Sequence, residues 1–382
     1  MRRRSLIAAL GAAAAVPALT ALPAYGREVT ALQRGADAVH RAGGAVGVAA
    51  VLHTPSGVSV AHSGVSDLRT DAPVRPDARY RAGSTVKTLV ATVLLQLVGE
   101  GRLSLDDAVE KWLPGVVGRP GITVRHLLQH TSGLRSYTSL RKVFPAGYSA
   151  REYYDNRFRR YTARELVTAA VREQPVFEPG AGWSYSNTNY VLAGMVIKQV
   201  TGRAWRTEVR DRIVRPLGLS GTTLPGNDPY LRAPYLHGYH TFAEDGRRID
   251  TTVFNSTAAD ASGDLVTTPG EVNRVFTALV TGELLRPAQL TEMQRTRPMP
   301  DSPERGYGLG LETTPLSTGG FYWNHGGNAL GFASENGITL DGRRSVTVVV
   351  NSFDEADEQA QEATDRAVKA LIDRALTGVR VR

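Results

Sequence analysis

A serine and a lysine lie three residues apart at the start of a strongly apolar segment. Ser84 and Lys87 frame the run Ser84-Thr85-Val86-Lys87, and helical residues three apart share one face. Burial lowers the pKa of an ammonium group, so a buried Lys87 amine could accept the proton of the Ser84 hydroxyl. Backbone N–H groups at the helix start could then stabilise an oxyanion. A helix-capping serine beside a solvent-reaching lysine is the commoner explanation of so short a pattern, and the pattern alone leaves both open.

Two further motifs strengthen the catalytic interpretation. Tyr185-Ser186-Asn187 follows a turn-rich loop, and His325-Gly326-Gly327 follows the apolar run Phe321-Tyr322-Trp323. Ser-x-x-Lys, Tyr-x-Asn and His-Gly-Gly stand in the order of the three motifs of penicillin-recognising serine enzymes, where the last is often Lys-Thr-Gly. The sequence has no Gly-x-Ser-x-Gly elbow, no Walker loop and no His-Glu-x-x-His, which argues against an α/β-hydrolase, a nucleotide-binding protein and a zinc-dependent protease of the zincin class.

From about Ala45 to its C-terminus, the chain resembles the serine β-lactamase and D-alanyl-D-alanine carboxypeptidase superfamily. It is most similar to the class C-like branch and to secreted, soluble D-Ala-D-Ala carboxypeptidases. Further segments carry this resemblance in the same order along the chain: Tyr80-Arg81-Ala82-Gly83, Leu103-Ser104-Leu105-Asp106-Asp107, Trp112-Leu113-Pro114, Ile122 to Gly133, Pro216-Leu217-Gly218-Leu219 and Tyr307-Gly308-Leu309-Gly310.

The resemblance implies an acyl-enzyme mechanism in which Ser84 attacks a carbonyl carbon. Lys87 and Tyr185 would share the proton of the nucleophile, either as a neutral amine or as a phenolate, and the sequence does not decide between them. The reaction would need no metal and no cofactor.

The resemblance also implies a set of substrate-binding residues around the nucleophile. Asn187 would orient the substrate amide, and His325 would line the opposite wall of the cleft. Gly326 and Gly327 would lead to Asn328, whose backbone N–H would form the oxyanion hole together with the N–H of the nucleophile.

Periodicity predicts the elements that must position these motifs. Apolar residues recur at helical spacing from Ser84 to Val98 and cover most of the circumference, which is typical of a buried helix. A helix is expected over residues 28–42, a hairpin over 45–60, and mainly helices over 103–240. The end of the chain predicts short strands and a closing helix, at Tyr307–Leu311, Phe321–Asn324, Ile338–Leu340, Val346–Val350 and Glu355–Leu376.

These elements predict an α/β (α+β sandwich) fold of the β-lactamase/transpeptidase type. An antiparallel sheet built from both chain ends would be flanked by helices, with a mostly helical lobe inserted. The α/β part is expected roughly at residues 27–102 and 250–382, and the helical lobe roughly at 103–249, within one hydrolase domain over 27–382.

The N-terminus predicts export. Residues 1–26 begin with Arg2-Arg3-Arg4, continue as an apolar run and end in small residues, which is the pattern of a cleaved Sec or twin-arginine signal peptide. No later stretch predicts a membrane anchor. The chain has no cysteine and a net charge of +8, without a concentrated basic run that would indicate nucleic acid. We therefore expect a secreted protein with possible cell-wall association.

The expected activity is that of a D-alanyl-D-alanine carboxypeptidase acting on cell-wall-type D-peptides, and the expected ligand is a small peptide or a β-lactam-type substrate. D-aminopeptidase, esterase or β-lactamase activity is an alternative, and a penicillin-binding sensor or a peptide cyclase is another. His237-Gly238-Tyr239-His240 could suggest a metal site, but without a nearby carboxylate motif a loop is favoured.

One position departs from the carboxypeptidase pattern. In the secreted carboxypeptidases that the chain resembles, an arginine after Tyr-Gly-Leu-Gly-Leu holds the substrate carboxylate, and here that position falls on Glu312. A carboxylate would repel the free C-terminus. This predicts weak carboxypeptidase activity and better turnover of amides, esters or a differently oriented D-peptide. An arginine among Arg141, Arg151, Arg157, Arg159 and Arg160, in an aromatic-rich segment, could restore the missing charge.

Overall fold

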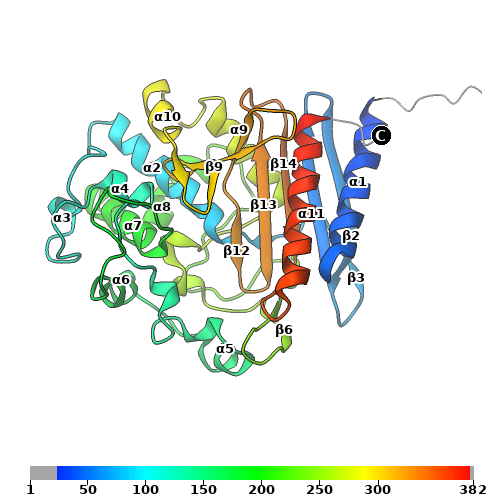
Figure 1. Cartoon of the computed structure of the whole chain (residues 1–382), viewed down its shortest axis with the longest axis horizontal. Coiled ribbons are helices and arrows are strands. Elements are labelled where there is room, and N and C mark those ends of the chain that lie inside the picture. Colours follow the sequence, from blue (N-terminus) through cyan, green and yellow to red (C-terminus); the bar gives the residue numbers. More distant parts are fainter. Residues whose placement is uncertain (1–23, 379–382) are drawn as a thin grey trace, which may run out of the picture.

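The computed structural model describes residues 24–378 (Figure 1). The predicted signal segment 1–26 therefore lies almost wholly outside the described residues, and export stays a prediction. None of the helices in the described range has the length and hydropathy that crossing a membrane would need.

A large antiparallel sheet forms the centre of the fold. Its strand order is β3-β2-β1-β14-β13-β11-β10-β9-β8, and β12 pairs with β13 beside this path. β1 comes from the start of the chain and β14 from its end, and they pair with Val48 opposite Val350. Two smaller sheets, β15-β5-β6 and β4-β7, lie outside this large sheet. The strands of all three sheets are β1 (Gly47–Thr54), β2 (Gly57–Asp67), β3 (Ala72–Pro73), β4 (Tyr80–Arg81), β5 (Tyr239–Thr241), β6 (Arg248–Asp250), β7 (Val266–Thr267), β8 (Arg297–Met299), β9 (Ser302–Tyr307), β10 (Glu312–Pro315), β11 (Phe321–Asn324), β12 (Gly327–Ala329), β13 (Phe332–Ile338), β14 (Ser345–Val350) and β15 (Ser352–Asp354).

Helices cover both faces of this sheet. α1 and α11 lie side by side on one face (Figure 1) and bury an apolar layer against β1 and β14. α9 packs against the opposite face of the same two strands. The helices are α1 (Ala24–Gly43), α2 (Val86–Gly99), α3 (Val109–Trp112), α4 (Val124–Leu128), α5 (Ala150–Asn156), α6 (Ala163–Val171), α7 (Asn187–Thr201), α8 (Trp205–Val209), α9 (Pro269–Val280), α10 (Pro287–Met293) and α11 (Glu358–Thr377). The predicted α/β fold is confirmed.

Two of the predicted strands are wrong in their bounds. The run predicted as a strand from Tyr307 to Leu311 is instead mostly the connection between β9 and β10, because Gly308 N–H donates to Leu311 O and Gly310 has a φ of +72°. The strand predicted to begin at Ile338 ends there, since it is the last residue of β13. Alternating apolar residues do not reveal such a turn.

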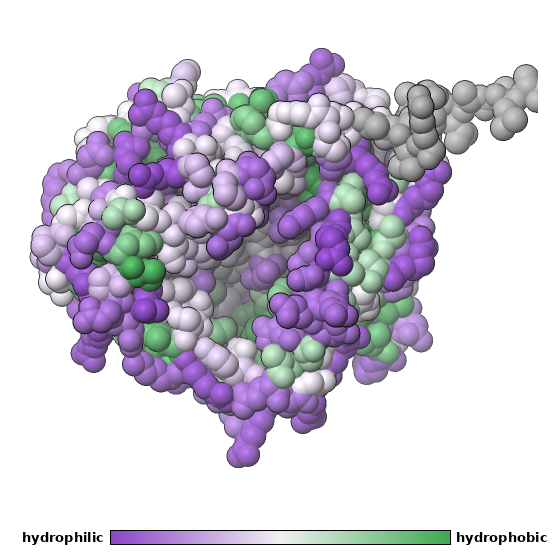
Figure 2. All heavy atoms as spheres, in the orientation of Figure 1, coloured by the Kyte–Doolittle hydropathy of each residue, from purple (hydrophilic) through white to green (hydrophobic). Residues whose placement is uncertain are grey.

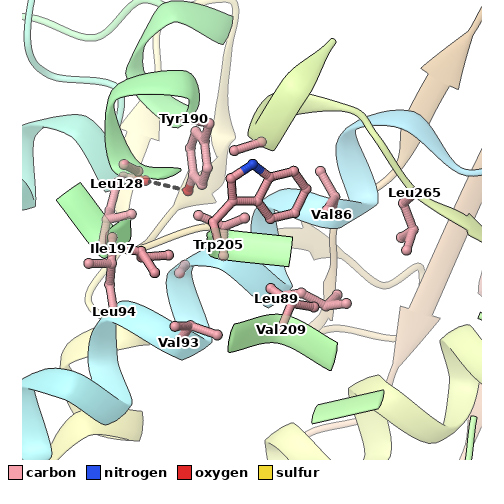
Figure 3. Packing of buried hydrophobic residues seen from close by; sticks show 14 of the residues in the cluster. Val86, Leu89, Val93, Leu94, Leu128, Tyr190, Ile197, Trp205, Val209 and Leu265 are labelled. Atoms are coloured by element: carbon pink, nitrogen blue, oxygen red, sulfur yellow. Dashed lines mark hydrogen bonds between the residues drawn. The ribbon is translucent and has the colours of Figure 1, made fainter. Parts of the chain in front are cut away.

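The helix α2 lies inside the main hydrophobic core of the protein. The 3-10 turn Gly83–Thr85 leads directly into it, and most of its side chains are buried. Figure 3 shows Val86, Leu89 and Val93 packed against Trp205 and Val209 of α8. Burying each such aliphatic side chain contributes about 1.5–3 kcal/mol, so this packing fixes the position of whatever α2 carries at its start.

The lobe between β4 and β7 is mainly helical, with α3 to α8 running through it (Figure 1). Its last part returns to strands: β5 pairs with β6 and, in parallel, with β15 near the end of the chain. This pairing places His240 opposite Phe353. Because β15 directly follows β14 of the large sheet, this pairing connects the lobe to that sheet.

Candidate active site

Ser84 lies in the 3-10 turn that precedes α2, and glycine makes this position possible. Gly83 has a φ of +50°, and a β-carbon there would lie 2.2 Å from Asn328 O. A β-carbon on Gly327 would lie 2.0 Å from Ala82 O and 2.8 Å from the backbone N of Ser84. The two glycines let β12 and the nucleophile turn approach backbone to backbone.

The amine of Lys87 lies directly beneath the Ser84 hydroxyl. Its Nζ is 2.8 Å from Ser84 Oγ, 2.8 Å from Asn187 Oδ1 and 2.7 Å from Ser262 O. The side chain is fully buried. Burial holds the pKa of Lys87 well below its ordinary value, against the opposing effect of the Glu312 carboxylate. The structure thus meets the condition under which this amine accepts a proton.

Tyr185 approaches the same hydroxyl from the helical lobe. Its OH donates to Ser84 Oγ at 2.9 Å. Burial raises the pKa of Tyr185 well above its ordinary value, so the phenol keeps its proton. The Tyr185 ring packs against His130, with ring centroids 4.3 Å apart. Nδ1 of His130 lies 3.2 Å from the donating Ser186 N, which ties the Tyr185 loop to the end of α4.

Asn187 stands at the start of α7, where its side chain bridges two parts of the site. Its Oδ1 accepts from Lys87, and its Nδ2 donates to Thr138 Oγ1 at 3.2 Å. The residue also lines the cavity beside Ser84. Asn187 therefore holds the Lys87 amine in place and is near enough for the predicted contact with a substrate amide.

The structure places His325 behind the wall of the cavity, which differs from the expectation that its ring lines the cleft. The residue is 1% exposed. Its Nδ1 is 2.8 Å from Gly326 O and its Nε2 is 2.9 Å from Tyr307 OH, so both ring nitrogens are engaged. Burial, with the nearby Lys87, lowers the pKa of His325 to about 3 and keeps the ring neutral. A neutral ring that is held at both ends supports the turn at Gly326.

Asn328 completes the wall opposite Lys87. It lies on β12, pairs with Ala333 on β13, and lines the cavity together with Ser84. The close approach at Gly83 and Gly327 brings the backbone of Asn328 beside that of the nucleophile. The two predicted oxyanion-hole residues are thus neighbours.

A cavity of about 380 Å³ runs from the nucleophile between the lobe and the sheet. Figure 2 shows this face of the molecule hollowed between the two. Near Ser84 the cavity is lined by Asn187, Ser262 and Asn328, and farther along by Phe144, Phe254, Leu330 and Phe353. The mixture of a few polar groups at one end and apolar side chains beyond it is typical of a small-molecule site.

Glu312 is buried and paired. It is 8% exposed on β10, and its Oε2 accepts from Arg305 Nη2 on the neighbouring strand β9 at 2.5 Å. Burial nevertheless raises the pKa of Glu312, and Arg305 and Lys87 both oppose this effect. At the position where the secreted carboxypeptidases have an arginine, this chain therefore has a carboxylate, and that carboxylate pairs with the Arg305 guanidinium.

The arginines of the segment 141–160 are held away from the cavity. Arg141 pairs with Glu152 and Glu244, and Arg157 lies over the rings of Tyr154 and Phe158. None of the five arginines predicted to restore the missing charge lines the cavity, although Phe144 of the same segment and Tyr137 just before it do.

Sequence reasoning missed several residues that build the site. Ser262 supplies a backbone carbonyl to Lys87, Tyr307 holds His325, and His130 supports Tyr185. His130 and Tyr307 lie inside segments that carry the family resemblance, and that placement was the available signal. Ser262 acts through its backbone oxygen, which no side-chain pattern reveals.

Comparison with protein families finds a match to the family described as Beta-lactamase over residues 27–371. Among curated proteins, Penicillin-binding protein 4* of Bacillus subtilis (strain 168) is 29% identical over 180 residues, which are 46% of this chain and 38% of that protein. Esterase EstB of Burkholderia gladioli is 33% identical over 191 residues, 46% of each chain. The matched stretch thus spans less than half the length of either relative.

Solved structures match almost the whole chain. A D-stereospecific amidohydrolase from Streptomyces sp. is 37% identical with a TM-score of 0.80, and the match covers 92% of this chain and 99% of that one. A D-amino acid amidase from Ochrobactrum anthropi SV3, complexed with L-phenylalanine amide, is 29% identical with a TM-score of 0.77. That match covers 91% of this chain and 98% of the other.

Proposed function

The chain belongs to the beta-lactamase family of serine hydrolases, and we propose that it is an amidohydrolase that forms an acyl-enzyme on Ser84 with a D-amino acid residue as the acyl group. The observation that carries this proposal is the position of Ser84 Oγ between Lys87 Nζ at 2.8 Å and Tyr185 OH at 2.9 Å.

The proposed first step is attack by Ser84 on the substrate carbonyl carbon. The lowered pKa of Lys87 and the raised pKa of Tyr185 favour a neutral amine over a phenolate as the base. The hydroxyl proton moves to Lys87 Nζ as the bond from Oγ to carbon forms. The backbone N–H groups of Ser84 and Asn328 stabilise the oxyanion, worth about 2.7–4 kcal/mol for each such donor.

The second half of the reaction returns the proton and releases the products. The Lys87 ammonium returns its proton to the leaving nitrogen, with the Tyr185 hydroxyl as a relay that accepts one proton and passes one on, and the carbon–nitrogen bond breaks. A water molecule then attacks the acyl ester under the same base, which takes its proton and returns it to Ser84 Oγ. The products are a free amine and an acid, without redox change.

The preference for an amide over a C-terminal acid rests on the wall that β9 and β10 form with Arg305 and Glu312, called the strand wall below. Glu312 lies behind the cavity lining, close enough to act on the pKa of Lys87, and holds Arg305 in an ion pair; neither of the two lines the cavity itself. A substrate that ends in a free carboxylate would find the Arg305 guanidinium already paired with Glu312 and would gain no ion pair from it. An amide or an ester needs no such ion pair, so its binding would not suffer. The similarity to a D-stereospecific amidohydrolase and a D-amino acid amidase over nine-tenths of the chain supports the same substrate class.

A D-Ala-D-Ala carboxypeptidase is the second candidate, and Arg305 is the observation that favours it. Its side chain is 26% exposed on β9, next to the position where the resemblance implies a carboxylate-binding arginine. A substrate carboxylate that displaced Glu312 from Arg305 would gain this contact.

A substrate panel tests both candidates. Purified protein is given D-phenylalanine amide, L-phenylalanine amide, a peptide ending in D-Ala-D-Ala and the C-terminal amide of that peptide. We expect the D-amide to be cleaved faster than its L-enantiomer, and the peptide amide faster than the free acid. Ser84→Ala should lose at least about 10³-fold in kcat, and mass spectrometry should trap an acyl adduct on Ser84 in the wild type only. A strong preference for the free acid would favour the carboxypeptidase, and undiminished turnover by Ser84→Ala would refute the acyl-enzyme.

A further inference from the structure

The cavity that begins at Ser84 has a second polar end. Beyond its apolar stretch it is lined by His240 of β5 and by Glu355, which follows β15. Glu355 is the one carboxylate among the residues that line this cavity, and Arg81 is the one cation. The catalytic mechanism uses neither His240 nor Glu355.

His240 is fixed in place and keeps one unused donor. Its side chain is 3% exposed and stacks on Phe353, with ring centroids 5.7 Å apart. Gly331 N–H donates to Nδ1 at 3.3 Å, so the neutral ring carries its proton on Nε2. Within the described part of the chain, Nε2 is buried and has no hydrogen-bond partner. The nearest acceptor, Glu355 Oε2, is 3.4 Å away and forms no hydrogen bond with it, so a better-placed acceptor in the cavity would stabilise this buried donor.

Glu355 stands beside this donor, and among the described side chains its carboxylate pairs with His240 alone. Its Oε2 lies 3.4 Å from His240 Nε2, without forming a hydrogen bond, and its side chain is 36% exposed. No lysine or arginine among residues 24–378 pairs with it. The cation in the cavity, Arg81, is occupied elsewhere, because its guanidinium donates to the carbonyl oxygens of Thr252, Pro229 and Phe254.

The separation of the two ends sets the length of a ligand that reaches both. Asn328, beside the nucleophile, and Gly331, which binds His240, are three residues apart along the β12–β13 hairpin. Because the chain reverses at Leu330 and Gly331, between β12 and β13, three residues at about 3.3 Å each give an upper limit, and Gly331 lies no more than roughly 10 Å from Asn328. An extended peptide spans that distance with at most about three residues.

We propose that Glu355 and His240 bind the amino-terminal residue of a short peptide whose carboxyl end is the acyl group transferred to Ser84. Glu355 accepts from the α-ammonium, and His240 Nε2–H donates to the carbonyl oxygen next to it. A lysine side chain offers an ammonium but no adjacent carbonyl, which is why the donor–acceptor pair fits a peptide N-terminus better. The inference rests on the proposed amidohydrolase activity and adds a requirement for a free amino end no more than about three residues upstream of the scissile bond.

The test uses matched p-nitroanilides with D-phenylalanine at the scissile position: D-Ala-D-Ala-D-Phe, its N-acetyl form, and N-acetyl-D-Lys-D-Ala-D-Phe. The measured quantity is the ratio of kcat/KM for the free tripeptide to that for its acetylated form. Glu355→Gln should lower this ratio by about 10-fold, mainly through KM, because a partly exposed charge-assisted contact is lost. Glu358→Gln removes an exposed carboxylate three residues away that does not line the cavity, and it should leave the ratio as in the wild type.

Each other outcome contradicts a stated part of the proposal. An unchanged ratio in Glu355→Gln would overturn it, and an equal fall in Glu358→Gln would reduce it to a general charge effect. If only the acetyl-lysine substrate suffered in Glu355→Gln, the ligand would be a side-chain ammonium and not a peptide N-terminus. If the wild type cleaved none of the three, acetylated forms included, the amidohydrolase proposal itself would fail.

Discussion

The two walls that face each other across Ser84 are both buried, but they carry charge differently. On the helical wall, burial shifts the pKa of Lys87 downward and that of Tyr185 upward, so both groups are held neutral. On the strand wall, Glu312 and Arg305 form an ion pair. The helical wall meets the cost of burial by neutralising its groups, whereas the strand wall meets it by pairing them.

This difference assigns the walls different roles. Proton transfer to and from Ser84 needs groups whose protonation can change, and a buried amine that is neutral provides one. An ion pair provides no such group, but under the proposed function it would affect which end of a substrate can lie against it. The proposal therefore gives the reaction to the helical wall and a part in the choice of substrate to the strand wall.

The largest expected effect comes from the helical wall. Lys87→Ala and Tyr185→Phe should each lower kcat for the D-amide by about 10²- to 10⁴-fold, because each removes one partner in the transfer of a single proton. Since the two act as a unit, the double variant should be little slower than the poorer single variant. Steady-state kinetics on the three purified proteins measures this.

Tyr154→Phe is the matched control, since it removes a phenol hydroxyl from an exposed residue that does not line the cavity. It should keep the wild-type rate. Losses in Lys87→Ala and Tyr185→Phe that multiply in the double variant would mean that the two residues act independently, and the single proton relay would have to be abandoned.

The same contrast explains what the sequence could predict. Ser84 and Lys87 are one helical turn apart, so a local pattern predicts their meeting, and Tyr185 and Asn187 share a recognisable motif. The alternation and length of the terminal strands predict the sheet. The strand-wall pair Arg305 and Glu312 depends instead on the register between β9 and β10, which the misplaced strand at Tyr307–Leu311 obscured.

The distal end of the cavity was beyond sequence reasoning for a similar physical reason. His240 and Glu355 meet only because β5 and β15 pair in parallel, 115 residues apart along the chain (355 − 240). The sequence favours a loop over a metal site for the motif from His237 to His240, and the structure has a loop at His237 and Gly238 that leads into β5 at Tyr239. A single polar residue at the end of a strand, such as His240, has no sequence pattern that predicts which distant residue it will contact.

An intermediate effect is expected when the ion pair of the strand wall is opened. Glu312→Gln removes the carboxylate and leaves the Arg305 guanidinium without its charged partner. The ratio of kcat/KM for a peptide ending in D-Ala-D-Ala to that for its C-terminal amide should rise by about 10-fold, since Arg305 can then donate to the substrate carboxylate. Competition between the two peptides, followed by chromatography, measures the ratio directly.

The double variant Arg305→Gln/Glu312→Gln should return this ratio to near the wild-type value, because the donor is gone as well. If the ratio stayed high in the double variant, the gain would come from lost repulsion alone. If Glu312→Gln left the ratio unchanged, the strand wall would have no part in selecting the substrate terminus.

The smallest effect concerns a second carboxyl group beneath the strand wall. Glu335 lies on β13 against Gly326, where a β-carbon would be 2.5 Å from its Oε2. Burial, with the nearby Glu312, raises the pKa of Glu335 from 4.5 to about 7. Because the folded-state pKa lies above the unfolded-state value, protonation stabilises the fold below pH 4.5, and this stabilisation is lost as the pH rises through 7.

Glu335→Gln resembles the protonated carboxyl at every pH, so it should remove this loss. Its free energy of unfolding should match that of the wild type near pH 4.5 and exceed it by about 1–2 kcal/mol at pH 8, since the partly exposed site retains only part of the full linkage effect. Urea unfolding at pH 4.5, 6, 7 and 8 measures the difference, with Glu358→Gln on the exposed side of α11 as the control. A difference that is constant across these four pH values would show that Glu335 does not titrate there. A constant value near zero would mean that the carboxyl stays neutral, as the groups of the helical wall do, and a constant positive value would mean that it stays ionised.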